Sequence, residues 1–367
     1  MSAMTATHRV LNFSAGPSAL PLLVLERARA EMLDFDGTGM SVMEQSHRGK
    51  AYEALHMRVL ARLHALMGLG DDHEVLLLQG GATQIFAQVA MNMLSPSDGA
   101  GYINLGTWGE KAEAAARALS NHVRNAAKCE ACLPESVLID SAWKYVHMTS
   151  NETVHGVQWP GALTQVPFDA RGLDVVCDAS SDIFSRPMRL SDYALVYAGA
   201  QKNLGPSGVT VVSVRKDWIA GGRSDIPSIF QWRTHAKDHS LHNTPPTFAI
   251  YMVDLVLDWI DQLGGLQVVA ARTDEKAKAV YGAIAASAGF YRCPVELGAR
   301  SEMNPVFRLP SEELEARFVK EAEAHGMAGL KGHRSVGGIR ASLYNAVEPS
   351  SAHALAAFMG DFATRVG

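Results

Sequence analysis

The sequence has few cysteines and no long apolar run. Four cysteines among 367 residues are too few to form a disulfide-stabilised framework. No stretch approaches the roughly 18 to 20 uninterrupted apolar residues that a membrane-spanning helix needs. The first ten residues also lack the apolar core of a signal peptide. We therefore expect a soluble, cytoplasmic protein with no membrane partner.

A strong charge of one sign is also absent. The chain has 33 Lys and Arg against 38 Asp and Glu, which gives a net charge of -5. This balance is ordinary for a globular protein and indicates no basic surface for a polyanion. Nucleic acid is therefore not an expected partner. The length allows two or more domains with a cleft between them.

Cys129 and Cys132 form the single C-x-x-C motif of the chain. No second cysteine pair stands at the spacing of a zinc site. A redox or zinc role is possible for such a pair, but we favour a chance spacing on a surface helix. We expect no metal site.

Short apolar runs alternate with amphipathic segments along most of the chain. The runs predict strands at 73–79, 99–106, 144–150, 174–180, 193–200 and 208–215. Several are apolar throughout, as expected for strands of a largely parallel sheet that is covered by helices on both faces. Apolar residues at three- and four-residue spacing predict helices at 18–35, 50–69, 82–93, 248–265 and 350–367. The sequence therefore predicts the α/β class.

A long predicted helix ends at Gly264 and Gly265. After it, the predicted helices and strands become shorter and less regular. We place a domain boundary near residue 263. The expected division is an N-terminal segment 1–20 that packs with the smaller domain, a large domain 21–262 and a small C-terminal domain 263–367.

Lys202 follows the end of one predicted strand, and Asp178 ends another. Ligands of open parallel sheets bind beyond the carboxyl ends of the strands. The two charges could form a plain structural ion pair. A lysine that loses solvation there can instead attack a carbonyl group. Pyridoxal phosphate requires both groups, because a lysine attaches it and a carboxylate keeps its ring nitrogen protonated.

Three further positions fit such a cofactor. The amides of Gly81, Ala82 and Thr83 lie at a predicted strand-turn-helix junction and could bind a phosphate, although two glycines there could serve only a tight turn. Trp108 could stack on a flat ring, but tryptophan is more often part of a core. Thr153 could bind the ring hydroxyl, but a loop threonine is usually local turn chemistry.

The chain resembles the phosphoserine aminotransferase family of class V, fold-type I pyridoxal phosphate enzymes over nearly its whole length. The motifs that carry the resemblance stand in the order of that family: NFSAGPSALP, SVMEQSHRGK, LLQGGATQ, SNETVHG, DASSDIFSRP, YAGAQKNLGPSG, HNTPPTF and LKGHRSVGGIRASLYNA. The resemblance implies a large domain with a mostly parallel seven-stranded sheet between helices, and a smaller C-terminal α/β domain.

The resemblance also implies roles for the residues of the cofactor site. Lys202 attaches pyridoxal phosphate, and Asp178 faces its ring nitrogen. Trp108 stacks on the ring, and Thr153 binds its hydroxyl. The phosphate is bound by Ala82, Thr83 and Gln201, and by Asn243 and Thr244 from the other subunit of a homodimer.

The implied substrates are glutamate and 3-phosphohydroxypyruvate, with phosphoserine and 2-oxoglutarate as products. A related phosphorylated intermediate of pyridoxine synthesis, 4-phosphohydroxy-L-threonine, is a further expected substrate. Each substrate carries an α-carboxylate and a distal anion, which arginine binds through two parallel hydrogen bonds. The resemblance assigns Arg340 to the α-carboxylate. It assigns His333, Arg334 and the partner-subunit copies of His47 and Arg48 to the distal anion.

The chain departs from some family members at two positions. Ala15 stands where some have serine, and Thr83 stands where some have arginine. The loss of one bidentate arginine would weaken anion binding by about 1.5 to 3 kcal/mol if nothing replaced it. An alternative function is that of a non-catalytic, pyridoxal-phosphate-binding dimeric scaffold. The retained lysine, aspartate and arginines argue against it.

Overall fold

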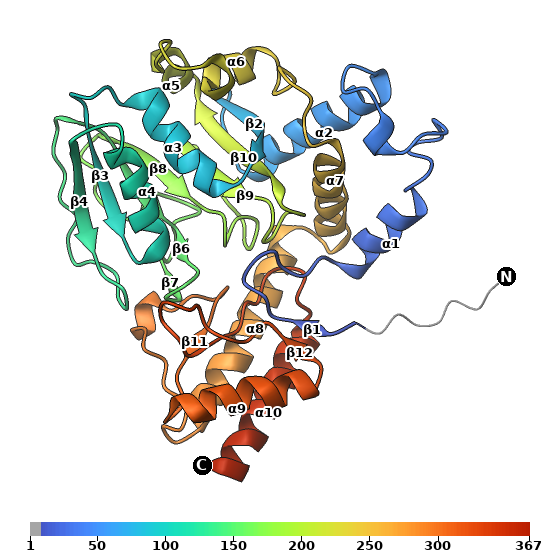
Figure 1. Cartoon of the computed structure of the whole chain (residues 1–367), viewed down its shortest axis with the longest axis vertical. Helices are drawn as coiled ribbons and strands as arrows, with labels where there is room; N and C mark the ends of the chain where they lie inside the picture. Colours follow the sequence, from blue (N-terminus) through green and yellow to red (C-terminus); the bar gives the residue numbers. More distant parts are fainter. Residues whose placement is uncertain (1–8) are drawn as a thin grey trace.

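A seven-stranded sheet forms the centre of the protein (Figure 1). The computed structural model describes residues 9–367. The strand order of the sheet is β2-β10-β9-β8-β5-β3-β4, and only β10 runs antiparallel to its neighbours. The strands are β2 (His73–Gly80), β3 (Gly99–Asn104), β4 (His122–Lys128), β5 (Trp143–Thr149), β8 (Asp174–Asp178), β9 (Leu195–Gly199) and β10 (Gly208–Arg215). The predicted mostly parallel α/β sheet is confirmed.

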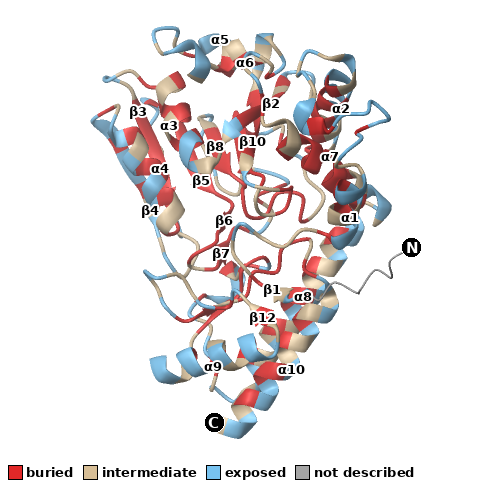
Figure 2. Ribbon diagram, turned by 45° about the vertical axis from the view of Figure 1, so that its right-hand side comes forward, coloured by how far each residue is buried: buried red, intermediate tan, exposed pale blue. Residues whose placement is uncertain are grey.

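Helices cover both faces of this sheet. On one side lie α1 (Leu22–Ala30), α2 (Lys50–Leu66) and α7 (Thr247–Gln262), and on the other lie α3 (Ala82–Met93), α4 (Thr107–Arg117), α5 (Lys216–Gly221) and α6 (Trp232–Lys237). Along β2, Val75 and Leu77 join one apolar cluster, while Leu76 and Leu78 join the other. The strands are buried between partly exposed helices (Figure 2). Two-sided burial explains why their sequences are apolar throughout.

The edge strand β4 has no counterpart among the strands predicted from apolar runs. Only Val123 and Ala126 of its seven residues are buried. An edge strand needs to bury only part of one face, so a polar sequence such as HVRNAAK gives no apolar run.

The C-terminal part of the chain lies below the sheet in Figure 1 and has its own apolar cluster. It is built on α8 (Leu266–Ala286), α9 (Glu312–Ala324) and α10 (Pro349–Val366), and it includes Phe13 from the N-terminal segment. The segment with Phe13 is held there because β1 (Leu11–Asn12) pairs in parallel with β12 (Met327–Ala328). The domain division near residue 263 stays a prediction.

The remaining elements are short. They are β6 (Asn151–Glu152), β7 (Val157–Gln158), β11 (Val306–Phe307), β13 (Ile339–Arg340) and the 3₁₀ turns η1 (Val42–Glu44), η2 (Ser228–Phe230) and η3 (Leu297–Ala299). β6 pairs with β7, and β11 pairs with β13. Within residues 9–367, no helix combines the length and apolar character needed to cross a membrane.

The two cysteines of the C-x-x-C motif are joined to each other. Cys129 and Cys132 form a disulfide in the loop that directly follows β4. The interpretation as a chance spacing on a surface helix is therefore wrong, because the segment is an irregular loop. Cys177 and Cys293 are free.

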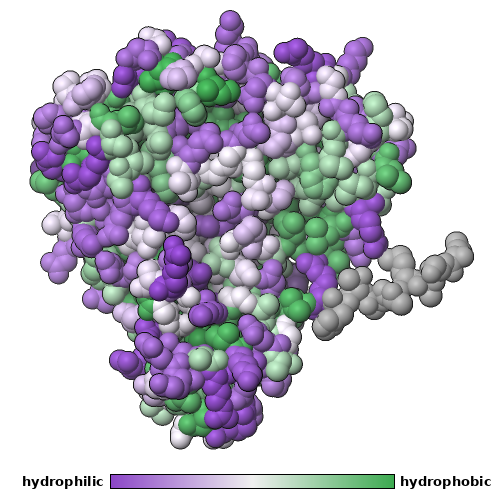
Figure 3. Space-filling model, viewed as in Figure 1, coloured by the Kyte–Doolittle hydropathy of each residue, from purple (hydrophilic) through white to green (hydrophobic). Residues whose placement is uncertain are grey.

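Exposed apolar side chains gather around α1. Figure 3 shows a hydrophobic area over this helix on an otherwise mixed surface. Leu22, Leu23 and Leu33 are 49%, 61% and 84% exposed. Met43 of η1 is also exposed. Contiguous exposed apolar area is uncommon on a monomer and is typical of an interaction surface.

Candidate active site

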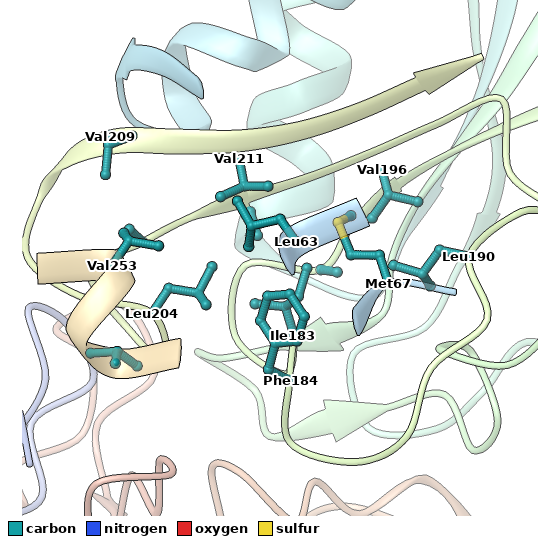
Figure 4. Close-up of a cluster of buried hydrophobic side chains, with 14 of the residues drawn as sticks. Leu63, Met67, Ile183, Phe184, Leu190, Val196, Leu204, Val209, Val211 and Val253 are labelled. Atoms are coloured by element: carbon teal, nitrogen blue, oxygen red, sulfur yellow. The ribbon is translucent and has the colours of Figure 1, made fainter. Parts of the chain in front are cut away.

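The turn that carries Lys202 lies at the carboxyl edge of the sheet. β8 ends at Asp178, which is in register with Tyr197 of the neighbouring parallel strand β9. The amides of Leu204 and Gly205 both donate to the carbonyl oxygen of Ala200, at 3.0 and 2.9 Å. This turn reverses the chain after β9, and Leu204 and Val253 of α7 belong to one buried cluster (Figure 4). The buried leucine therefore anchors the turn that presents the lysine.

The lysine side chain reaches two of the other predicted residues. Its Nζ donates to Thr153 Oγ1 at 3.1 Å and lies 5.6 Å from the centre of the Trp108 ring. Burial lowers the pKa of Lys202, while the charges of Asp178 and Glu152 oppose that shift. A lowered pKa makes the neutral, nucleophilic amine easier to reach near neutral pH.

Asp178 is 4% exposed. Its Oδ1 accepts a hydrogen bond from the Ser180 amide at 2.9 Å. Within the described chain, no hydrogen bond reaches its Oδ2. Burial raises the pKa of Asp178, and the nearby Lys202 charge and the Ser180 bond act in the opposite direction. One carboxylate oxygen is thus available for a cationic group of a ligand.

The N-terminus of α3 lies close to the lysine turn. A Cβ atom placed on Gly199, at the end of β9, would lie 3.6 Å from the amide nitrogen of Ala82. Gly81 is the N-cap, and no side chain caps this helix. The amides of the first turn, which include those of Ala82 and Thr83, can therefore bind an anion, and the helix dipole favours one there.

Further cations lie near Trp108 and Thr153. Lys111 Nζ lies 4.6 Å from the centre of the Trp108 ring. Arg340 Nη1 donates to the carbonyl oxygen of Thr153 at 3.2 Å. Burial lowers the pKa of His333, and the neighbouring charges of Arg340, Arg334, Lys111 and His155 lower it further. The charges of Arg334 and Arg340 therefore act on His333, and we call these three residues the cationic cluster.

Four of the predicted residues lie apart from this group. His47 and Arg48 lie in the segment between η1 and α2, and Thr244 is exposed before α7. Asn243 donates to Gln79 Oε1 at 3.3 Å, at the end of β2. Within residues 9–367, no hydrogen bond or ion pair joins any of the four to Lys202, Asp178 or Arg340. Their assignment to a partner subunit's site stays a prediction.

Several residues that fix the lysine turn escaped sequence reasoning. The Ser18 amide donates to the carbonyl oxygen of Gln201 at 2.9 Å, and the Ser18 hydroxyl donates to that of Lys202. Asn203 Nδ2 donates to Ile183 O at 2.9 Å, and Asn203 Oδ1 accepts from the Asn345 amide at 3.0 Å. A buried asparagine directly after the lysine was the one available signal, because a buried amide requires partners.

Glu152 is a second buried carboxylate at the site, which the sequence reasoning also missed. It is 0% exposed, and it accepts hydrogen bonds from the amides of Trp108 at 3.0 Å and Val154 at 3.2 Å. The N-cap of α4, Gly106, has no side chain to cap the helix, so Glu152 supplies the acceptor from another segment. Its place before Thr153 in SNETVHG was the only available signal. The contact fixes the backbone of the tryptophan that faces Lys202.

We expect Glu152→Gln to change how the stability of the cofactor-free protein depends on pH. Burial raises the pKa of Glu152 from 4.5 to about 7. Between these values the folded state binds more protons than the unfolded state, so this residue's contribution to stability is full below pH 4.5 and is lost as pH rises through 7. The change amounts to about 3 kcal/mol in the free energy of unfolding. Urea unfolding at pH 4.5 and 7.5 measures it.

The exposed Glu135→Gln serves as the matched control for this experiment. The free energy of unfolding of Glu135→Gln should depend on pH as that of the wild type does. In Glu152→Gln, the decrease of this free energy between pH 4.5 and 7.5 that we assign to the buried carboxyl should be absent. Identical pH dependence in the wild type and Glu152→Gln would contradict the interpretation.

The residues at this edge of the sheet fit pyridoxal phosphate. An available carboxylate oxygen, a partly buried amine and uncapped helix amides match its ring nitrogen, aldehyde and phosphate. Within residues 9–367, the buried indole Nε1 of Trp108 and Nε of Arg340 have no hydrogen-bond partner. Buried donors without partners are rare in native proteins and are consistent with a bound polar ligand.

Comparisons with known proteins agree with this chemistry. The profile of the family described as aminotransferase class-V matches residues 10–355. A protein of Herpetosiphon aurantiacus named phosphoserine aminotransferase is 49% identical over 98% of this chain and 99% of its own.

Two solved structures extend the comparison. The phosphoserine aminotransferase from Bacillus circulans subsp. alkalophilus is 48% identical, with a TM-score of 0.94 over 98% of this chain and 100% of the other. The pyridoxal-phosphate-bound phosphoserine aminotransferase from Trichomonas vaginalis is 34% identical, with a TM-score of 0.89 over 96% and 99% of the two chains.

Proposed function

The chain belongs to the class-V aminotransferase family, and from this premise we propose that it is a phosphoserine aminotransferase. It is a pyridoxal-phosphate-dependent enzyme. The proposed reaction transfers an amino group between L-glutamate and 3-phosphohydroxypyruvate, which gives phosphoserine and 2-oxoglutarate in the synthesis of serine. The observation that carries the proposal is the meeting of Lys202, Thr153 and Trp108 beside Asp178 at one edge of the sheet.

Each part of the cofactor has a residue that would hold it. Lys202 would attach the aldehyde carbon, and Asp178 would bind the protonated ring nitrogen. The amides of Ala82 and Thr83 would bind the phosphate, with Gln201 beside them. When bound, the cofactor supplies a conjugated ring that accepts the electron pair released at the substrate α-carbon.

Lys202 is the proposed proton carrier of the reaction. When its Nζ is free of the cofactor, Lys202 could take up the proton of the substrate α-carbon and hold it beside that carbon. Thr153 Oγ1 holds Nζ at 3.1 Å in the protein itself. The amine therefore acts from a fixed position at the turn that Leu204 and Asn203 anchor.

The cationic cluster is the proposed substrate site. Arg340 would bind the α-carboxylate, and its donation to Thr153 O keeps the guanidinium next to the lysine. His333 and Arg334, with the partner-subunit copies of His47 and Arg48, would bind the distal phosphate or carboxylate. Lys111 would add a cation to this cluster, whereas this chain has Thr83 where some family members have an arginine. The carbonyl oxygen of Ala15, the other departure, accepts a hydrogen bond from Tyr344 at 2.9 Å.

A homodimer is the proposed functional form, and Asn243 and Thr244 would reach the phosphate of the other subunit's cofactor. The exposed apolar residues of α1 and η1 support a dimer surface on this side of the molecule. The cytoplasmic location expected from the sequence stays a prediction.

Glutamate should bleach the visible absorption of the holoenzyme, and 3-phosphohydroxypyruvate should restore it with formation of phosphoserine. This ping-pong behaviour follows because the amino group is stored on the enzyme between the two half-reactions. Absorption spectroscopy and product analysis measure both halves. Parallel assays with the keto acid precursor of 4-phosphohydroxy-L-threonine compare the two pathways. A holoenzyme whose absorption glutamate leaves unchanged would instead support the non-catalytic scaffold.

A further inference from the structure

The disulfide of Cys129 and Cys132 closes a short loop next to the proposed substrate site. We call residues 129–132 the cysteine loop. It follows β4 and is the only disulfide among the residues that the structure describes. Neither the proposed reaction nor its cofactor uses these two residues.

The bonded cysteines are more accessible than Cys177, the buried free cysteine. Cys177 in β8 is 0% exposed, whereas Cys129 and Cys132 are both partly exposed. Exchange of a disulfide requires a thiolate to approach one of its sulfur atoms, so access decides which cysteines react. The cysteine loop therefore meets the steric requirement for exchange with an external thiol.

Backbone hydrogen bonds tie the cysteine loop to both parts of the chain. The Cys129 amide donates to Asn104 O at 3.0 Å, at the end of β3 and just before the turn that leads to Trp108. The amide of Glu296, from the C-terminal part, donates to Ala131 O at 2.9 Å. The loop thus connects the edge of the sheet with the segment that follows α8.

The same loop forms a wall of a cavity that contains a substrate-binding candidate. The cavity has a volume of about 200 Å³, and Glu130 and Ala131 line it together with Arg340 and His155. Glu130 Oε2 lies 3.9 Å from His155 Nε2, and Glu130 Oε1 lies 3.4 Å from Lys128 Nζ. Movement of the cysteine loop would therefore move the Glu130 carboxylate and the hydrogen bond from Glu296 to Ala131, beside the cationic cluster.

We propose that Cys129 and Cys132 form a thiol–disulfide exchange site for a dithiol reductant, and that its redox state sets the affinity for the anionic substrate. A thiolate of the reductant attacks one cysteine sulfur and forms a mixed disulfide, and the other cysteine leaves as a thiolate. The second thiol of the reductant then displaces the first cysteine. Two electrons and two protons pass to the protein, which gains two thiols, and the reductant becomes a disulfide.

Reduction weakens substrate binding because it opens the four-residue ring that fixes Glu130 and Ala131. The loss of one fixed hydrogen bond, such as that from Glu296 to Ala131, corresponds to a change of about three- to tenfold in the KM for 3-phosphohydroxypyruvate. The effect on KM rests on the proposed function, whereas the exchange itself does not. The amount of bound cofactor should be the same in both states, because within residues 9–367 no hydrogen bond or ion pair joins the cysteine loop to Lys202, Asp178 or the start of α3.

The test counts thiols in the folded holoenzyme before and after treatment with dithiothreitol. Maleimide labelling followed by peptide mass analysis should show two additional labels after reduction, on Cys129 and Cys132. Reoxidation with oxidised glutathione should remove them. Full labelling of both residues after oxidation would overturn the exchange site, and this result is independent of any enzymatic activity.

Kinetics of the same samples test the effect on the substrate. KM for 3-phosphohydroxypyruvate should be three- to tenfold higher after reduction, with visible cofactor absorption unchanged. The double variant Cys129→Ser, Cys132→Ser should keep the reduced-state KM under both treatments, while Cys293→Ser should respond as the wild type does. Equal KM values in the two states of the wild type would overturn the control of affinity. Absence of turnover in both states would refute the proposed function and leave the label count as the test of exchange.

Discussion

The Lys202→Ala variant is expected to transfer amino groups about 10²- to 10⁴-fold more slowly than the wild type. This is the usual contribution of a positioned proton-transfer group. Lys202 is the amine that the structure places beside Thr153, Trp108 and the Asp178 charge. Alanine removes both the attachment point of the cofactor and the proposed proton carrier. Steady-state rates with glutamate and 3-phosphohydroxypyruvate measure the loss.

Two further variants separate chemistry from folding. Lys202→Arg keeps a positive charge, but a guanidinium stays protonated and cannot act as a base, so it should be as slow as alanine. Lys278→Ala removes an exposed lysine that pairs with Asp274, and it should keep the wild-type rate. Wild-type turnover by Lys202→Ala would refute the assigned role.

The Asp178→Ala variant is expected to lose about 3 to 5 kcal/mol of stabilisation at the reacting centre. That corresponds to roughly two to four orders of magnitude in rate. Without the buried carboxylate, the protonated ring nitrogen of the cofactor has no counter-charge and its capacity to accept electrons falls. Burst and steady-state kinetics with glutamate measure this effect.

Asp178→Asn tests whether charge or shape is required. The amide keeps the volume and can still accept the hydrogen bond from the Ser180 amide. It lacks the negative charge, so we expect a rate much closer to that of Asp178→Ala than to the wild type. Asp192→Asn, which removes an exposed partner of Arg189, provides a neutral control. A wild-type rate for Asp178→Asn would show that the charge is not needed.

The sheet was predictable from the sequence wherever its strands are buried on both faces. The run that ends with Asp178 and the run that precedes Lys202 end at the same edge of the sheet, and this alone predicted that the amine and the carboxylate lie together. β4 escaped because an edge strand that buries only Val123 and Ala126 has no apolar run. A sequence pattern of apolar residues shows how much of a strand is buried. It does not show whether the backbone pairs with a neighbouring strand.

Site residues that stand at or just after the end of a strand were predictable from the sequence. Site residues that depend on contacts between segments far apart in the sequence were not. Glu152 caps a helix that begins 45 residues earlier, and its neighbours in the sequence do not indicate which helix it reaches. Lys111 lies three positions after Trp108, on the same side of α4. It was not predicted as a site residue, because a charged residue on a helix usually only faces solvent. The disulfide was not predicted because it lies in an irregular loop. The C-x-x-C spacing alone does not show whether the two cysteines lie in a loop or on a helix.

The pairing of β1 with β12 has a consequence for the order in which the enzyme is completed during synthesis. Leu11 pairs with Met327, so more than 300 residues separate the two halves of this small sheet. A ribosome that adds about 5 to 20 residues per second needs roughly 15 to 60 seconds to supply the second half. Until then the N-terminal segment, with Ser18 on the lysine turn, lacks its anchor. The nascent chain can form its large sheet early, but the active lysine receives its full support only when translation is almost finished.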